Sequence, residues 1–308
     1  MPKHSKPRCG SLQYWPRKRI NKFVPSVNWG VLENKKGFLG FICYKVGMAS
    51  VMVRDNTEHS MMKGKNVVLP VSVLECPAMK IFSVRFYKYH KVIGEVLIPA
   101  DKELKRVLKL PKEYKKLENF KKDYDDMRLV VYSQAKKTSI KKKPDVAEIG
   151  LSGTKEEKLE LIKKFIGKEI TINDVFDKKE LTDVRGLTKG KGLQGPVKRF
   201  GITLKQHKSE KGQRRPGSLG PWHPARVTFR VPMAGQLGMF TRLQLNSKII
   251  EIKKPENDEF KNYGIVKNDL LMLNGSVQGT PKRVLLLTPA LRKTKNKEKK
   301  NFEFVRVL

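Results

Sequence analysis

The sequence predicts a mainly β protein, in which a Greek-key β-barrel is interrupted by an α/β insert and carries long basic extensions. Three observations support this fold class. Runs with the alternating apolar pattern of strands occupy residues 37–74 and return over residues 240–287. Residues 95–183 hold 18 of the 30 acids together with helix signals. Residues 185–250 instead carry 14 Lys and Arg against one acid, Glu210, with ten glycines and five prolines that break both periodicities.

Residues 1–34 are expected to form a basic N-terminal arm. The first thirty residues contain seven Lys and Arg and no acid, and they follow neither helical nor strand periodicity. Arg17, Lys18 and Arg19 come directly after Pro16. A segment of this kind is expected to become ordered on a polyanionic partner.

The barrel is predicted from two separated parts of the chain, residues 35–80 and 168–290. Both parts contain short apolar runs bounded by Gly, Pro and polar residues, which is typical of strands. The expected strands lie within residues 37–53, 67–74, 240–252 and 269–287. Within the second part, residues 185–232 are expected to leave the barrel as a basic finger.

Residues 81–167 are predicted to be the inserted α/β module. Its expected helices cover residues 101–108, 112–126 and 155–165, and its expected strands cover residues 82–89 and 128–132. The third helix has a capping box, with Thr154 at the N-cap and Glu157 three residues later. A cluster of lysines within residues 136–143 is expected on an exposed loop that faces phosphate.

Residues 291–308 are expected to form a basic tail. Residues 292–300 contain six Lys and Arg against one acid, and the alternation over residues 302–308 suits an edge strand.

Overall charge indicates the class of partner. The 308 residues carry a formal net charge of +36, and a protein with such an excess repels itself and attracts nucleic acid. A membrane surface is the weaker alternative, because the sequence shows no basic amphipathic helix with a continuous apolar face. Apolar residues make up 39% of the chain, which is enough for a packed core.

Cysteine usage and apolar runs indicate the compartment. Cys9, Cys43 and Cys76 are odd in number and form no CxxC pair, which favours reduced intracellular thiols over disulfides or a zinc site. The chain shows no secretory signal, and apolar runs such as residues 37–44 are too short to cross a bilayer. We therefore expect a cytoplasmic protein with no membrane partner.

Motifs for catalysis are weak. Gly190, Gly192 and Gly195 match GxGxxG, but Pro196 and basic residues follow where a dinucleotide-binding unit needs an apolar helix. The acids within residues 123–126 are surrounded by lysines at helical spacing, which favours a solvated helix face over an acid/base or Mg²⁺ cluster. The five histidines lack metal-ligand spacing. The sequence predicts no enzymatic activity, no catalytic residue and no metal site.

Trp222 is the most informative aromatic residue. It lies in the turn formed by residues 220–224, GPWHP, between basic segments that contain little apolar sequence. One interpretation is that the ring packs on a core. The favoured interpretation is an exposed ring at a loop tip that stacks on or wedges between bases.

Several motifs together resemble one family, the universal large-subunit ribosomal protein three family of archaeal and eukaryotic type. The motifs are GLTKGKGLQGPVKR over residues 186–199, PWHP over 221–224, AGQLG over 234–238, GSL over 10–12 with PRKR over 16–19, and GSV over 275–277 with Lys282 and Arg283. The resemblance covers nearly the whole chain. Two positions depart from the family pattern: Gln278 stands where proline is common, and Glu210 interrupts the charge of the finger.

The resemblance implies a structural constituent of the large ribosomal subunit. It implies a barrel similar to that of the translation factors, and a primary rRNA-binding protein that attaches near the 3′ end of 23S-type rRNA and nucleates subunit assembly. The finger would extend toward the peptidyl-transferase centre, with Trp222 and His223 at its tip. Implied neighbours are large-subunit proteins fourteen and twenty-four-e, with one copy of the chain per ribosome, no homo-oligomer, and no cofactor beyond the Mg²⁺ of the rRNA.

The resemblance and the charge pattern together nominate the site residues. The nominated rRNA-binding residues are Arg17, Lys18, Arg19, Lys189, Lys191, Lys198, Arg199, Lys205, His207, Lys208, Arg214, Arg215, Arg226, Arg230, Arg242, Lys282 and Arg283. Glycines expected to let the backbone approach RNA closely are Gly190, Gly192, Gly195, Gly235 and Gly238.

Two alternatives stay open at this point. An RNA-modifying enzyme with a basic guide extension would need a cofactor pocket or an acid/base pair. A chromatin-type protein would bind duplex DNA as well as structured RNA.

Overall fold

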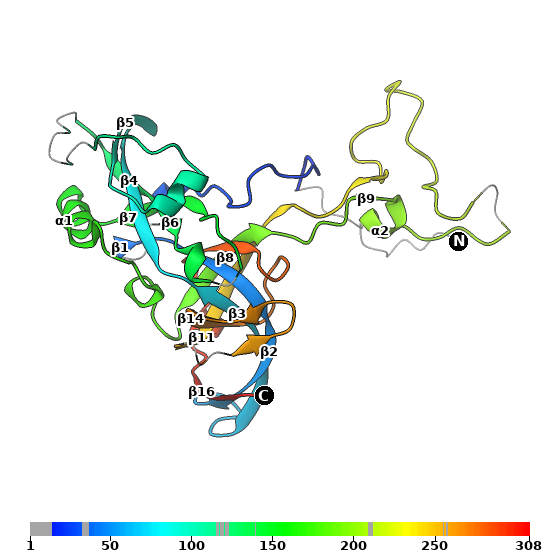
Figure 1. Cartoon of the computed structure of the whole chain (residues 1–308). Coiled ribbons are helices and arrows are strands. Elements are labelled where there is room, and N and C mark those ends of the chain that lie inside the picture. Colours follow the sequence, from blue (N-terminus) through cyan, green and yellow to red (C-terminus); the bar gives the residue numbers. More distant parts are fainter. Residues whose placement is uncertain are drawn as a thin grey trace. The chain divides into compact units, whose positions relative to one another are not determined.

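Figure 1 shows a computed structural model of the chain. The structure describes residues 14–32, 37–114, 117, 120, 123–138, 140–208, 212–254, 256 and 258–308. The chain divides into two compact units: a smaller one from Met1–Lys22 and Thr188–Thr241, and a larger one from Phe23–Leu187 and Arg242–Leu308.

A seven-stranded antiparallel sheet forms one part of the larger unit. Its strand order is β15-β8-β11-β14-β3-β2-β16, and β15 also pairs with β2, so that the sheet is ring-like. The closing contact pairs Tyr44 with Val284, while the same Tyr44 pairs with Glu75 on its other side. The strands are β2 (Phe41–Asp55), β3 (Asn66–Cys76), β8 (Leu181–Leu187), β11 (Thr241–Lys253), β14 (Asp269–Asn274), β15 (Val284–Pro289) and β16 (Phe302–Val307).

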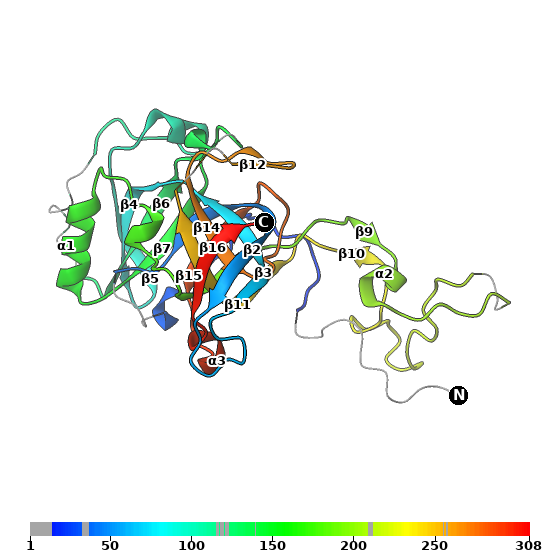
Figure 2. The ribbon, with the colours of Figure 1, turned by 90° about the horizontal axis from the view of Figure 1, so that it is seen from below.

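A five-stranded antiparallel sheet forms the other part of the larger unit, in the order β1-β7-β6-β4-β5. Its strands are β1 (Gly37–Phe38), β4 (Met79–Lys88), β5 (Lys91–Leu97), β6 (Asp126–Ser133) and β7 (Val146–Ser152). Helix α1 (Lys155–Phe165) lies beside this sheet (Figure 2). Phe165 of the helix meets Phe38 of β1 edge-to-face, with the ring centroids 5.1 Å apart.

Shorter elements complete the described chain. They are the 3-10 helices η1 (Trp29–Val31), η2 (Lys102–Arg106), η4 (Ala135–Lys137) and η5 (Ile172–Asp174), the helices α2 (Pro196–Phe200) and α3 (Lys295–Glu298), and the two-residue strands β9 (Leu193–Gln194), β10 (Gly235–Gln236), β12 (Glu259–Phe260) and β13 (Gly264–Ile265).

Both sheets contribute to one core. Phe41 and Leu285 from the ring-like sheet and Ile149 from the five-stranded sheet belong to the same buried cluster. Leu271 of β14 also belongs to it, whereas its neighbour Leu270 belongs to a second cluster. Because side chains alternate along a strand, β14 is apolar on both faces and separates the two clusters.

Two glycines make room for one aromatic ring in this core. Trp29 is buried, and a Cβ added to Gly40 or Gly150 would lie within 2.9 Å of its side chain. Such a distance is a clash, so these positions of β7 and of the segment before β2 need glycine for packing.

Local signals predicted most elements correctly. The helix at 155–165 is confirmed with its capping box: Glu157 N donates to Thr154 Oγ1, and Thr154 N donates to Glu157 Oε2. The predicted strands are found, including the edge strand β16, which pairs with β2. At residues 101–108 the structure has only the short helix η2.

The helix predicted over residues 112–126 is wrong where the structure describes it. None of its described residues is α-helical, and Asp126 already begins β6. Phe120 instead stacks on Phe86 of β4, with the centroids 3.9 Å apart, and Tyr124 packs on the same ring. Apolar residues at helical spacing are thus used to cover a strand, and tertiary packing overrides helix propensity. Residues 115–116, 118–119 and 121–122 lie outside the described chain.

The remaining expectations concern thiols and membranes. Cys43 and Cys76 are free and buried, and Cys9 lies outside the described residues. Across the described ranges, no helix has the length and apolar character needed to span a bilayer.

Candidate nucleic-acid interface

A short strand pair organises the smaller unit. β9 and β10 are antiparallel, with Gln194 opposite Gly235. The ladder continues beyond them, because Lys191 N donates to Leu237 O and Leu237 N donates to Gly192 O, both at 2.9 Å. Two chain segments some forty residues apart are thereby held side by side, and the basic loop between them begins and ends at a fixed base.

Helix α2 follows β9 and is limited at both ends by its sequence. Pro196 occupies the first turn, where its missing N–H costs nothing. Gly201 ends the helix in the left-handed region, at φ 66°, a conformation that glycine adopts without strain. This five-residue helix places Lys198 and Arg199 next to each other but in different environments.

Arg199 is a structural residue of the strand pair. Its Nε donates to Gln236 O at 3.0 Å, and its Nη1 donates to Met233 O at 3.0 Å. Nη2 reaches Arg17 O of the arm at 3.4 Å. Burial lowers the pKa of this guanidinium from its usual value, yet an arginine remains charged at neutral pH. Its donors are directed to the chain itself, while Lys198 is exposed.

An aromatic cluster packs the N-terminal arm against α2 and Phe229. Trp15 packs edge-to-face on Phe229, with centroids 5.2 Å apart, and stacks at 6.4 Å on Phe200 of α2. The Arg17 guanidinium lies 4.5 Å from the centre of the Phe200 ring and 5.2 Å from that of Trp15. Cation–π contacts of this kind stabilise by about 0.5–2 kcal/mol, and they order the arm where the sequence shows no periodicity.

At three of the five nominated glycines an added Cβ would meet another part of the chain. A Cβ on Gly238, at φ +81°, would lie 1.9 Å from Lys189 O. A Cβ on Gly235 would lie 2.7 Å from the Arg199 guanidinium, and one on Gly190 would lie 3.0 Å from the Met239 side chain. Gly192 and Gly195 have nothing within 4 Å. Close approach of the backbone to RNA stays a prediction; Gly190, Gly192 and Gly195 are exposed.

The nominated cations of the smaller unit differ in their exposure to solvent. Its described residues contain no Asp or Glu. Arg17, Arg199 and Lys205 are half-buried, and Lys205 N closes a loop by donating to Gln213 O at 3.1 Å. The exposed ones are Lys18, Arg19, Lys189, Lys191, Lys198, His207, Lys208, Arg214, Arg215, Arg226 and Arg230. A surface of one sign with no acid is the electrostatic pattern of a polyanion-binding surface.

Trp222 is exposed, as the loop-tip interpretation requires. Its side chain is 88% accessible, and the neighbouring His223 is also exposed. Gly220, the first residue of the turn, has a φ of +129°, which only glycine adopts readily. The alternative in which the ring packs on a core of this chain is therefore wrong.

Three nominated cations belong to the larger unit. Arg242 is half-buried on β11, Lys282 is exposed at φ 67°, and the Arg283 guanidinium lies 5.2 Å from the centre of the Phe23 ring. Gln278, the departure from the family pattern, bridges two neighbouring strands: its Nε2 donates to Val184 O at 2.9 Å and to Arg242 O at 3.1 Å. Proline has no donor and could not make these contacts.

The basic tail is more ordered than the sequence indicated. Lys248 of β11 is buried, and its Nζ donates to Lys297 O at 3.2 Å, to Glu298 O at 3.0 Å and to Lys300 O. Asn246 Nδ2 donates to Arg292 O at 2.8 Å. The end of α3 is thus capped by a side chain about fifty residues away, and the tail cations are held on the surface. Only the six Lys and Arg of residues 292–300 signalled this cationic surface in the sequence.

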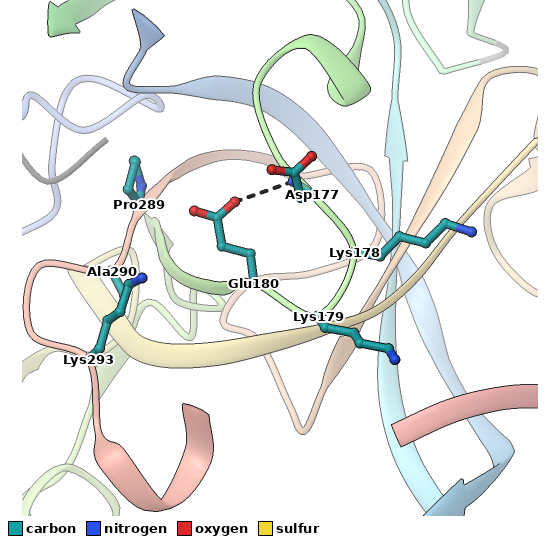
Figure 3. Close-up of a pocket in the computed structure, with 7 residues that line it drawn as sticks. All are labelled: Asp177, Lys178, Lys179, Glu180, Pro289, Ala290 and Lys293. Carbon is teal, nitrogen blue, oxygen red and sulfur yellow. Dashed lines mark hydrogen bonds between the residues drawn. The ribbon is translucent and has the colours of Figure 1, made fainter. Parts of the chain in front are cut away.

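A hollow of about 360 Å³ lies beside the tail (Figure 3). Its lining includes Asp177, Glu180 and Lys293. The main-chain N of Asp177 donates to Glu180 Oε2 at 3.3 Å, and Lys178 and Lys179 extend away from these acids. Glu180 accepts a hydrogen bond from its own loop, and the lining contains no Ser, Thr, Cys or His, so these residues do not form a catalytic constellation.

The three acids of residues 123–126 also have partners within the chain. Lys88 binds Asp123 at 2.9 Å, Tyr89 N donates to Asp125 at 3.0 Å, and Lys158 binds Asp126 at 2.7 Å. Among the described residues, no group of His, Cys, Asp and Glu is arranged to hold a metal ion.

Comparison with known proteins places these features in one family. The model of a family described as ribosomal protein L3 matches residues 1–97 and 99–306. The chain is 38% identical to the large ribosomal subunit protein uL3 of Methanococcus aeolicus, over 96% of this chain and 94% of that relative. It is 37% identical to the proteins of the same name in Methanobrevibacter smithii, over 97% and 95%, and Methanocaldococcus jannaschii, over 94% and 92%.

Proposed function

Because the chain belongs to the ribosomal protein L3 family, we propose that its smaller unit binds the rRNA of the large ribosomal subunit. As a member of this family, the chain is a structural, non-enzymatic constituent of that subunit. Large-subunit rRNA and other ribosomal proteins are accordingly its partners.

One observation carries the proposal. The described residues of the smaller unit include thirteen exposed Lys, Arg or His side chains and no acid. These side chains extend from a frame that Arg199, Trp15 and the β9–β10 pair hold together. In a free globular protein such a surface repels itself, and phosphates supply the missing countercharge.

The position within the subunit is the finer part of the proposal. We propose that the chain attaches near the 3′ end of the large-subunit rRNA, nucleates assembly, and directs Trp222 toward the peptidyl-transferase centre. The family resemblance of the motifs and the 88% exposure of Trp222 support this. Proteins fourteen and twenty-four-e would be its neighbours, with one copy in each cytoplasmic ribosome.

The larger unit would correspond to the family architecture. The ring-like sheet, which is not a true barrel because β16 lies outside the ring, would take the place of the barrel similar to that of translation factors, from residues 35–80 and 168–290. The five-stranded sheet with α1 would contain the insert of residues 81–167. The arm of residues 1–34, the finger of residues 185–232 and the tail of residues 291–308 would complete it.

The test is the salt dependence of binding to a large-subunit rRNA fragment. With about eight phosphate contacts, affinity should fall roughly a thousandfold or more between about 50 and 200 mM salt. Duplex DNA of the same length serves as competitor and should compete poorly at every salt concentration. A nearly flat salt dependence, or equal competition by duplex DNA, would contradict the proposal.

A further inference from the structure

The smaller unit contains an apolar hollow that phosphate contacts alone do not explain. Its volume is about 340 Å³. Pro196, Pro216, Leu219 and Met233 contribute apolar surface to its lining, and Arg214 and Arg215 contribute two guanidinium groups. We call it the apolar hollow.

The wall of this hollow is built by the chain itself. Arg199 holds one side, because its Nη1 donates to Met233 O at 3.0 Å and to Ala234 O at 3.4 Å. Pro196 begins α2 and is fixed with it, while the ring of Pro216 restricts the backbone on the other side. A preformed concave wall avoids the entropic cost of building the site on binding.

The chemistry of the lining selects the occupant. Leu219 and Met233 are 41% and 42% exposed, so the hollow offers apolar surface to a partner. Arg214 and Arg215 are exposed, and the described residues of this unit provide no acid to neutralise them. The occupant should therefore be apolar and flat on one part and anionic on another. A guanidinium matches a phosphate with two parallel hydrogen bonds.

The size of the hollow limits how many nucleotides it can bind. It lies at the lower end of the range of about 300–1,000 Å³ for small-ligand sites, which suits one nucleotide and not a duplex. Proteins recognise single-stranded RNA by splaying out such unstacked bases and holding them on flat apolar or guanidinium surfaces.

We propose that the apolar hollow receives one unstacked nucleotide of rRNA. Its base lies against Leu219 and Met233, and its phosphate binds Arg214 and Arg215. This inference rests on the proposed function and adds a base-binding site to a surface otherwise described by phosphate contacts.

The experiment fills the hollow in assembled large subunits that contain the full chain. Leu219→Trp and Met233→Trp place a large ring in it, and Val227→Trp is the matched control, because Val227 is 52% exposed and outside the lining. The rRNA is probed with dimethyl sulfate and with a 2′-hydroxyl acylating reagent. Both filling variants should raise the reactivity of the same single nucleotide by at least about fivefold, since its stacking is lost, and the control should not.

A second pair of variants keeps the test decisive if a chain with Leu219→Trp or Met233→Trp does not fold. Arg214→Gln with Arg215→Gln leaves the apolar surface intact and should raise the reactivity of the same nucleotide, whereas Arg226→Gln should not. Unchanged reactivity in all hollow variants, or rRNA changes spread equally among hollow and control variants, would overturn the proposal. If subunits with Leu219→Trp or Met233→Trp then still form and their protein binds rRNA with the salt dependence of the native chain, the proposed function stands while the base-binding site is rejected.

Discussion

Arg199 is joined to Gln236 across the base of the smaller unit, where its Nε donates a 3.0 Å hydrogen bond to the main-chain oxygen of Gln236. The neighbouring Lys198 is exposed. These two adjacent cations thus have different roles: Arg199 stabilises the β9–β10 strand pair, and Lys198 is available to bind phosphate.

Arg199→Lys should loosen the strand pair although it keeps the charge, because lysine lacks the planar fork of donors. A hydrogen bond from a charged group contributes about 1.5–3 kcal/mol, so the Lys191 and Leu237 amides should exchange their hydrogens at least about tenfold faster in the free chain. Lys198→Ala should leave this exchange unchanged and reduce the salt slope of RNA binding by about 1. Equal exchange rates in the two variants would contradict the division of roles.

Gly238→Ala should disrupt the smaller unit more than Gly195→Ala. A Cβ at Gly238 meets Lys189 O at 1.9 Å with φ at +81°, whereas a Cβ at Gly195 meets nothing within 4 Å. Backbone strain alone costs about 1–3 kcal/mol, and the clash adds to it. Subunit yield on sucrose gradients should fall for Gly238→Ala. If Gly195→Ala lowers yield to the same extent while the free protein is unaffected, that glycine is needed for RNA.

Trp222→Ala should leave the stability of the free chain within about 0.5 kcal/mol, because the ring is 88% exposed. Stacking of one ring contributes about 1–3 kcal/mol, a small part of the total attachment, so subunits should assemble at near-normal yield. Peptide-bond formation or inhibitor response of the purified ribosomes should be altered. A complete block of assembly would show that the ring is needed for folding and not for stacking at a tip.

Lys248→Met should release the tail. It leaves the carbonyls of Lys297 and Glu298 without the donor that now binds them at 3.2 and 3.0 Å. The free energy of unfolding should fall by about 1.5–3 kcal/mol, measured by urea titration, and limited proteolysis should cut within residues 292–300. Lys254→Met, at an exposed position of the same segment, is the control, and equal effects of both would exclude a specific cap.

Asp55 should make stability depend on acid pH. Hydrogen bonds from Ser60 Oγ at 2.6 Å and Thr57 N at 2.9 Å lower the pKa of its carboxyl below the usual value. The stabilisation is fully present above the unfolded pKa of about 3.9 and is lost as the pH falls through the lower folded value. Urea unfolding across this range should show a steeper loss for the native chain than for Asp55→Asn. Parallel curves would contradict the role of Asp55.

Features that are determined by residues close together in the sequence could be predicted, whereas features that depend on distant contacts could not. The capping box of Thr154 and Glu157 spans three residues and was predicted with its partners. The role of Arg199 depends on carbonyls 34 and 182 positions away, and no pattern near Arg199 reveals them. The helix predicted at 112–126 is wrong for the same reason: Phe120 stacks on Phe86 of β4, a contact that no local pattern reveals. Local sequence patterns therefore predicted helices and strands, and overall charge predicted a nucleic-acid partner. Long-range contacts determined which cations and glycines stabilise the fold.

The pairing of β2 has a consequence for how the chain is made. Cys43 of β2 contacts Leu285 of β15, 242 positions later, so the ring-like sheet cannot close while those residues are still unsynthesised. At about 5–20 residues per second this wait lasts roughly 12–50 seconds. During that time the apolar edge of β2 has only β3 beside it, and an unpaired strand edge invites aggregation. Synthesis of this cationic chain therefore includes an interval in which the nascent β2 edge needs protection, and a slowed ribosome would lengthen it.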